Sequence, residues 1–395
     1  MRSVAVYIHL CLILLSMAIL CLTAGSAWAI SMTDYQVPVS RATSAFGGFQ
    51  YNYAFKDSTT ADNGNLFLNF NQFFSSLPMG YSLGFNGILN RDGLAAKDRD
   101  KYSYSASAFT QGNKYLRDAG NLFGFGRLDA VGATAYDRPG FTLTVGMGYG
   151  RFINATPLAR ALRAEEELLK ERVLTGVVPD DLVLEVAKRM APEVIATYRQ
   201  EYDYWERYYY GDLEKEFQKS GKLRDNELGS VGTLVIRDVL NEFISDRYYG
   251  YELSAGMGYD IQTPFKDQDR QAFLEGNANF AYPINLRSQF VEFLRVRSPL
   301  TDDKFGREIH LTFKPTYSYE ISNALDFVAS YILTGDKLEV EGEDSSMKFD
   351  HQLVITAAYF IANRIDFTSS LSFSKPHGKD KVASQFSSGL TYRLR

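Results

Sequence analysis

The clearest structural signal is the stretch 308–320, which reads Glu308-Ile309-His310-Leu311-Thr312-Phe313-Lys314-Pro315-Thr316-Tyr317-Ser318-Tyr319-Glu320. Every second residue from Ile309 to Tyr319 is apolar, and the residues between them are polar or charged. Successive side chains of a β-strand point to opposite faces, so this period predicts a strand with one apolar and one polar face. Its length is about what a tilted strand needs to cross a bilayer.

The same alternation recurs along most of the chain outside 152–248. The pattern predicts fourteen strands, an even number as single-chain bacterial barrels require. Counts of twelve or sixteen remain open, because 101–112, 121–134 and 287–297 alternate less cleanly. The expected strands are 43–56, 64–74, 79–90, 101–112, 121–134, 140–151, 250–262, 271–283, 287–297, 307–320, 323–334, 348–361, 363–374 and 382–394.

A soluble β-sandwich also alternates, so polarity alone does not identify a membrane barrel. The expected strands are long and uniform, whereas strands of soluble proteins usually have about five or six residues. Aromatic residues lie near the ends of the apolar faces, as they do at a membrane interface. The sequence also ends within a strand pattern. Together these features favour the membrane barrel.

That last strand reads Ser387-Ser388-Gly389-Leu390-Thr391-Tyr392-Arg393-Leu394. It resembles the C-terminal assembly signal of bacterial outer-membrane β-barrels, with Ser387, Gly389, Tyr392 and Leu394 at the matching positions. The resemblance covers eight residues and indicates the broad porin-like class. It implies an all-β transmembrane antiparallel up-and-down barrel, surrounded by outer-membrane lipid and inserted by the barrel-assembly machinery.

The N-terminal segment 1–29 is typical of a secretory signal peptide. Arg2 precedes an apolar run, and Ala27 and Ala29 fit the small-x-small cleavage rule. An uncleaved membrane anchor is the alternative, because the run is long enough to span a bilayer. Both cysteines, Cys11 and Cys21, lie in this segment, so we expect a thiol-free mature chain in the cell outer membrane.

The formal net charge of −5 provides no basic surface for nucleic acid. After the signal segment only His310, His351 and His377 remain, and no serine is spaced to form a nucleophile with them. We therefore expect no catalytic residues, no cofactor and no metal site. The acidic loop 339–344 could attract Ca²⁺, but a solvated loop is the preferred interpretation.

The chain is expected to divide into the signal segment, a first barrel part at 30–151, an insert at 152–248 and a second barrel part at 249–395. Short connections such as 283–285 and 321–323 alternate with longer, charged ones. In outer-membrane barrels short turns face the periplasm, and the strand count places the insert on that side.

The insert changes to a helical period after Pro157, with helices expected at 158–175, from 179 onward, at 192–219 and at 226–245. It is expected to be either a small helical domain or a hairpin of helices packed under the barrel mouth. Its aromatic residues could bind a sugar ring or a partner protein. The preferred interpretation is an aromatic seam against the barrel rim or lipid headgroups. These residues are Tyr198, Tyr202, Trp205, Tyr208 and Tyr209.

Sixteen polar residues of the expected strands fall on the face opposite the apolar one, and they predict a wet lumen. They are Gln50, Asn52, Asn69, Asn71, Asn86, Glu252, Glu275, Asn277, Asn279, His310, Thr312, Lys314, Glu320, Asp326, Asp366 and Thr368. The sequence therefore predicts a water-filled, porin-like channel for small polar solutes. The alternative is an outer-membrane anchor or an assembly or export component, whose insert docks a periplasmic protein or peptidoglycan.

Overall fold

The structure is a computed structural model that describes residues 30–56, 58–94, 100–117, 120–242, 244–301, 304–338, 346–362, 365–379 and 381–393. The signal segment, the acidic loop 339–344 and Leu394 lie outside these ranges. Gln50, Asn52 and Tyr392 are placed by their backbones alone.

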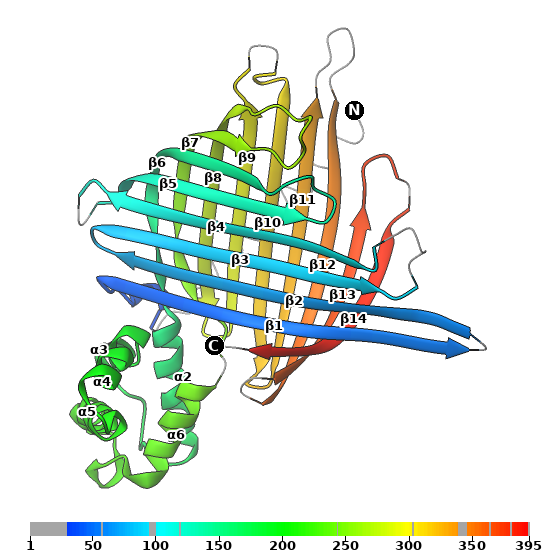
Figure 1. Cartoon of the computed structure of the whole chain (residues 1–395). Coiled ribbons are helices and arrows are strands. Elements are labelled where there is room, and N and C mark those ends of the chain that lie inside the picture. The colour runs from blue at the N-terminus through cyan, green and yellow to red at the C-terminus, as the bar shows by residue number, and fades with distance from the viewer. Residues whose placement is uncertain are drawn as a thin grey trace.

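Fourteen antiparallel strands form one closed barrel in which each strand pairs with its neighbours in the sequence, and β14 closes on β1 (Figure 1). This confirms the expected up-and-down barrel with a helical insert. The strands are β1 (Val39–Lys56), β2 (Ser58–Ser76), β3 (Met79–Asp92), β4 (Tyr102–Tyr115), β5 (Leu122–Ala133), β6 (Gly140–Asn154), β7 (Tyr248–Gln262), β8 (Ala272–Asn285), β9 (Ser288–Pro299), β10 (Glu308–Ser322), β11 (Leu325–Leu338), β12 (Ser346–Ala362), β13 (Ile365–Lys375) and β14 (Ala383–Arg393).

One connection differs from expectation. Residues 57–63 were expected to form a loop, but β1 and β2 continue pairing to Lys56 and Ser58. A register shift between Ala54 and Phe55 keeps the two strands paired near the tip. The resulting hairpin projects beyond its neighbours (Figure 1).

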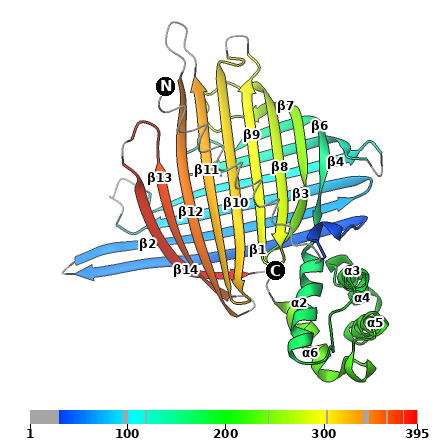
Figure 2. The same cartoon turned by 180° about the vertical axis from the view of Figure 1, so that it is seen from behind.

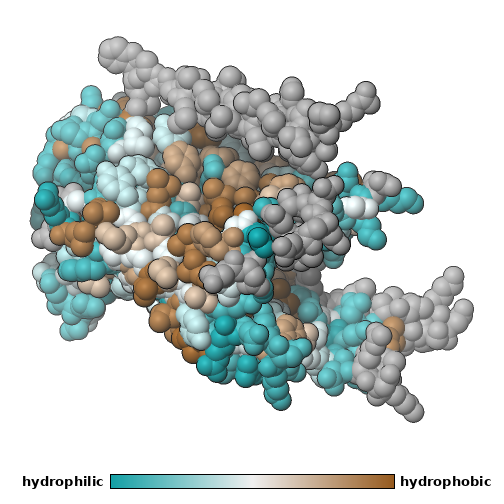
Figure 3. All heavy atoms as spheres, turned by 90° about the horizontal axis from the view of Figure 1, so that it is seen from above, coloured by the Kyte–Doolittle hydropathy of each residue, from teal (hydrophilic) through white to brown (hydrophobic). Residues whose placement is uncertain are grey.

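The apolar faces of the strands point outward. On β6, Phe141, Leu143, Val145, Met147 and Tyr149 are all exposed, while Thr144 and Gly148 between them are buried. Figure 3 shows apolar side chains gathered across the middle of one face of the molecule, with hydrophilic ones toward its edges. This outer surface suits lipid contact, because it presents a row of exposed apolar side chains.

The insert contains α2 (Thr156–Lys170), α3 (Asp180–Arg189), α4 (Pro192–Glu201), α5 (Trp205–Lys219) and α6 (Gly229–Asn241), with a 3-10 turn η2 at Arg224–Asn226. The expected helix 158–175 ends earlier, since Leu174 pairs with Leu223 in an isolated bridge. The expected helix 192–219 is divided at 202–204. Among the described residues, no helix is long and apolar enough to span a membrane.

The helices gather at the end of the barrel that carries the short turns 286–287 and 323–324 (Figures 1 and 2). Their buried core also includes Met32 and Tyr35, which lie in and beside the 3-10 turn η1 (Met32–Asp34) before β1. The insert therefore has a core of its own, and it completes that core with the segment that leads into the barrel.

Candidate functional site

Hydroxyl groups line the inner face of β10 to β14. The hydroxyls of Thr316 and Ser330 lie 3.0 Å apart, and those of Thr356 and Ser370 lie 2.9 Å apart. Thr368, one of the sixteen expected lumen residues, is 3.1 Å from Thr391. This wall offers uncharged hydrogen-bonding groups. Of the hydroxyl-bearing residues, only Thr368 and Thr312 are among the expected lumen residues.

Side-chain amides line the inner face of β2 and β3. The amide of Asn71 donates to Asn69 at 2.6 Å, and Asn86 is the register partner of Asn69 on β3. On β1, Gln50 is in register with Asn65 and Asn52 with Asn63. The structure thus brings the expected Asn69, Asn71 and Asn86 of two neighbouring strands into one patch.

Charged residues line the inner face of β5 to β9. Three of them are arginines, and each of these arginines has an acidic partner. Arg127 binds Asp129 through two hydrogen bonds of 2.7 Å, and Arg297 binds both oxygens of Asp260 at 3.0 Å. Arg295 lies 3.6 Å from an oxygen of Glu275 and donates to Asn277 at 3.1 Å. These three guanidinium groups also lie over the rings of Phe109, Phe293 and Phe273.

Sequence reading found Glu275 and Asn277 but missed the arginines. The alternation along β9 could have revealed them, because Arg295 and Arg297 share one face of this strand with Phe293. The inner face of β9 was obscured by inward Val291 and Phe293, while Glu292 turns outward. Segment 287–297 therefore looked like a poor strand although it is a complete one.

Other expected lumen residues lie on the same inner face. Glu252 accepts from the amides of Gln111 and Asn113 at 3.5 Å, and Asn279 is its register partner. Toward the long loops, His310 contacts Asp336 at 2.6 Å and Glu308 at 3.1 Å. The register on β10 places Thr312 and Lys314 on the same face as His310.

Glu320, Asp326 and Asp366 are buried at the short-turn end and do not line open lumen. Asp366 accepts from the hydroxyl of Thr368 at 2.8 Å, and Asp326 accepts from Ser245 of the insert at 2.6 Å. All three acids lie at strand ends, and the insert contacts two of them, Glu320 and Asp326. The sequence predicted that these acids face inward, but it did not predict the contact with the insert.

The insert leaves the barrel through a hairpin stem, residues 150–154 of β6 paired with 248–252 of β7. Gly150 and Gly250 have φ angles of 123° and 122°, which side chains rarely tolerate. Beyond them the stem contacts distant strands. The backbone N–H of Asn154 donates to Ser40 at 2.8 Å, and its side chain donates to the Arg41 carbonyl at 3.0 Å.

Tyr248 shows that the stem spans the short-turn mouth. Its backbone N–H donates to Gln289 of β9 at 2.7 Å, and its ring packs edge-on against Phe73 of β2 at 5.8 Å. Strands 2 and 9 are seven apart in a ring of fourteen, so they lie on opposite walls. The stem therefore crosses the lumen at this end.

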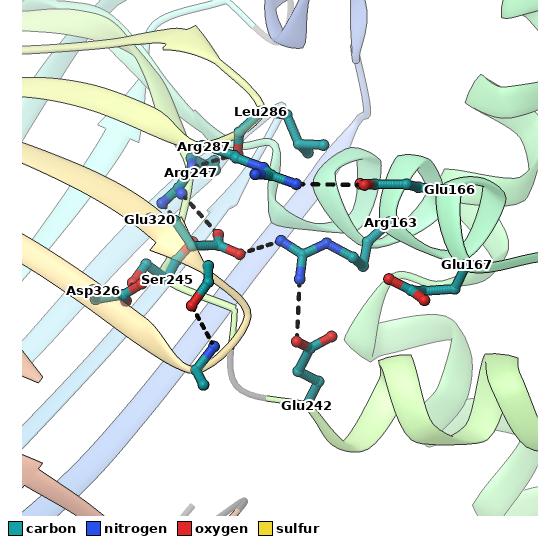
Figure 4. Close-up of polar contacts among 12 residues, drawn as sticks. Arg163, Glu166, Glu167, Glu242, Ser245, Arg247, Leu286, Arg287, Glu320 and Asp326 are labelled. Atoms are coloured by element: carbon teal, nitrogen blue, oxygen red, sulfur yellow. Dashed lines mark hydrogen bonds and ion pairs between the residues drawn. The ribbon is translucent and has the colours of Figure 1, made fainter. Parts of the chain in front are cut away.

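A buried ion network fixes the insert in this position (Figure 4). Arg163 of α2 pairs with Glu320 of β10 and, at 3.1 Å, with Glu242. Arg247 of the stem contacts the other oxygen of Glu320 at 3.4 Å and donates to the Leu286 carbonyl at 3.1 Å. Arg163, Arg247 and Glu320 are each 5% exposed or less. Such a network is costly to break, because each partner would become a lone buried charge.

The environment of these groups shifts their acidities. Burial alone would lower the pKa of Arg163, but its hydrogen bond and ion pair with Glu320 outweigh this and raise it. Burial raises the pKa of Glu242, although Arg163 opposes that rise. At the rim, Glu166 contacts Arg287 of the β8–β9 turn at 3.4 Å. The contact between the insert and the barrel is thus electrostatic as well as apolar.

The expected aromatic cluster packs within the insert. Tyr209 is buried in its core, with Tyr198 and Trp205 packed against it. The Tyr198 hydroxyl donates to Asp212 at 2.6 Å, and Tyr202 stacks on Tyr208 with ring centroids 4.4 Å apart. Tyr198, Tyr202, Tyr208 and polar neighbours such as Arg189 and Asp212 line an open depression of about 360 Å³, the insert hollow.

Within the described ranges, no group of three or more acidic or histidine side chains is arranged to hold a metal ion. No protein-family model and no curated protein matches this sequence. Several solved structures show a low similarity to it, among them the following two. OmpF of Salmonella typhi, in a complex with daunomycin, gives a TM-score of 0.34 at 10% identity, with 90% of this chain and 97% of OmpF covered. CdiB from Escherichia coli gives 0.35 at 8% identity, with 94% of this chain and 63% of CdiB covered.

Proposed function

We propose that the protein is an outer-membrane channel for small polar solutes, restricted at its periplasmic mouth by the stem of the helical insert. The observation that carries the proposal is a continuous polar interior behind an apolar outer surface. Hydroxyls, amides and paired charges line that interior, and buried polar groups without partners would each cost about 1–3 kcal/mol. Water in the lumen removes this penalty, so an aqueous path explains the polar residues of the inner faces.

The charge arrangement supports weak ion selectivity. Arg127, Arg295 and Arg297 are each matched by an acidic neighbour, so the wall presents no row of one sign. An unbalanced row would concentrate counter-ions through its field. We therefore expect similar permeability for small cations, anions and neutral polar solutes.

Planar-bilayer recording of the purified protein tests the channel. We expect small conductance steps for the natural chain and larger ones for Tyr248→Ala, which removes the contact with Phe73 on the opposite wall. Tyr251→Ala is the matched control, since this tyrosine is exposed on the outer face of the same strand. The absence of steps from all three correctly folded proteins would refute the channel.

A second candidate function is a docking module, in which the barrel anchors an insert that binds a periplasmic partner or peptidoglycan. The insert hollow favours it, since tyrosine and arginine are frequent in binding sites and polar groups there are already held in place. Co-sedimentation with purified peptidoglycan tests one form of this idea. Tyr202→Ala together with Tyr208→Ala should abolish binding, whereas Tyr204→Ala, outside the hollow, should not. Equal loss in both variants would contradict a site in the hollow.

A further inference from the structure

A second hollow lies inside the lumen, where the stem meets the wall formed by β1 to β4. It has a volume of about 150 Å³, and we call it the floor hollow. Ser44, Asn71 and Ser82 line it from the barrel, and Asp246 and Tyr248 line it from the insert. Neither the barrel nor the insert alone would make this site.

The wall of the floor hollow consists of two adjacent rows of register partners. One row contains Ser44, Asn71, Gly84 and Phe109, and the next contains Phe73 and Ser82. A Cβ at Gly84 would lie 2.2 Å from the Phe109 ring, so glycine is what lets this ring lie against the wall. The result is an apolar surface bordered by hydroxyl and amide groups.

The insert supplies the carboxylate of the site. The Tyr248 hydroxyl donates to one oxygen of Asp246 at 3.1 Å, and Tyr248 is itself held between Phe73 and Gln289. Asp246 lines the hollow. Burial raises the pKa of Asp246, while the charges of Arg160 and Arg247 oppose that rise and reduce its attraction for a cation.

We propose that the floor hollow binds a small neutral polyol, such as glycerol or a single sugar ring, on its way through the channel. Hydroxyl groups of the ligand would bond to Ser44, Asn71, Ser82 and Asp246, while its C–H groups pack on Phe73 and Phe109. An anion is disfavoured because Asp246 is the charged residue lining the site. The volume agrees with this size, since a cavity of about 150 Å³ holds a benzene-sized molecule.

This inference rests on the proposed channel, but its test uses no conductance. Ser82→Cys is introduced into the mature protein, purified, and checked by thiol titration to contain one cysteine. The rate of its reaction with a small methanethiosulfonate is measured with and without glycerol. Asn86→Cys is the matched control, because it is on the same strand and face, roughly 13 Å away and outside the hollow.

Glycerol should slow the reaction at position 82 by about twofold at half saturation and leave position 86 unchanged. Asp246→Ala, and Gly84→Ala through displacement of Phe109, should remove the protection. Equal effects at both positions, or protection by methylammonium or acetate but not glycerol, would overturn the inference. A conducting protein without protection at 82 refutes this inference alone. Protection without conductance would instead refute the channel.

Discussion

At the scale of single residues, Arg163 links the insert to the barrel through ion pairs. It is 1% exposed and pairs with Glu320 and Glu242. Replacing it with leucine removes the close cation from Glu242 and leaves Glu320 with Arg247 as its remaining partner. Loss of one partner of a buried ion pair costs about 3–5 kcal/mol.

We therefore expect Arg163→Leu to lower the free energy of unfolding of the insert by that amount. Trp205, the single tryptophan after residue 29, reports this transition through its fluorescence in urea. Lys188→Ala is the control, because its pair with Glu185 is exposed and worth less than about 1 kcal/mol. A similar small effect from both variants would show that the network does not stabilise the insert.

Glu193 is a residue whose charge opposes folding. One of its carboxylate oxygens is buried without a hydrogen-bond partner, and burial raises its pKa above the ordinary 4.5. An acid with a raised pKa destabilises the folded state at pH above that pKa, and protonation on acidification removes the penalty.

Glu193→Gln should therefore stabilise the insert at pH 7 by on the order of 1 kcal/mol. The difference should shrink as the pH falls from 7 toward 4.5. Urea titrations of Trp205 fluorescence at several pH values measure it, with the exposed Glu185→Gln as control. A difference independent of pH would mean that the charge of Glu193 is not the cause.

At the scale of elements, Gly150 and Gly250 bend the stem across the mouth. A Cβ at position 250 would lie 2.1 Å from the Arg151 carbonyl oxygen, and the φ angle of 122° is itself strained for other residues. Arg151 in turn donates to the carbonyls of Leu77 and Gly120 in two turns. The bend is thus built from backbone geometry and then secured by side chains.

Gly250→Ala should cost about 1–3 kcal/mol through its φ angle alone and displace the stem. We expect larger or more variable conductance steps, measured in planar bilayers. Gly112→Ala is the control, since its added Cβ meets nothing within 4 Å. Unchanged conductance in the Gly250 variant, with the barrel folded, would show that the bend does not restrict the mouth.

Sequence alternation predicted the strands with a clean two-residue period directly, because one apolar and one polar face fix the register along the length of a strand. The segments 101–112, 121–134 and 287–297 alternate less cleanly, and the structure shows that they are strands too. The same two-residue alternation predicted which residues face the lumen. The stem could not be predicted, since Asn154 meets Ser40 and Tyr248 meets Phe73 only after the barrel closes. The arginines of β9 were missed because inward aromatics and an outward glutamate broke the simple pattern.

At the scale of the whole molecule, the insert and the long loops lie at opposite ends of the barrel. Cysteine at Ser220 marks the insert, and cysteine at Asp267 marks the β7–β8 loop. If the insert is periplasmic, an impermeant maleimide added to intact cells should label position 267 and leave 220 unlabelled. Permeabilised cells control for reactivity at 220. Labelling of 220 with 267 silent would reverse the proposed orientation.

The packing of Met32 and Tyr35 against the insert also bears on the order in which the chain assembles. The buried members of this core all lie between Met32 and Ile244, and the Tyr249 hydroxyl donates to the Tyr35 carbonyl at 2.7 Å. A chain that extends only as far as β7 already contains every buried member of this core. The insert can therefore fold first and hold the start of β1 in place while β8 to β14 are added. The long-range closure of β14 on β1, the slow step in such a topology, would then begin from a tethered end.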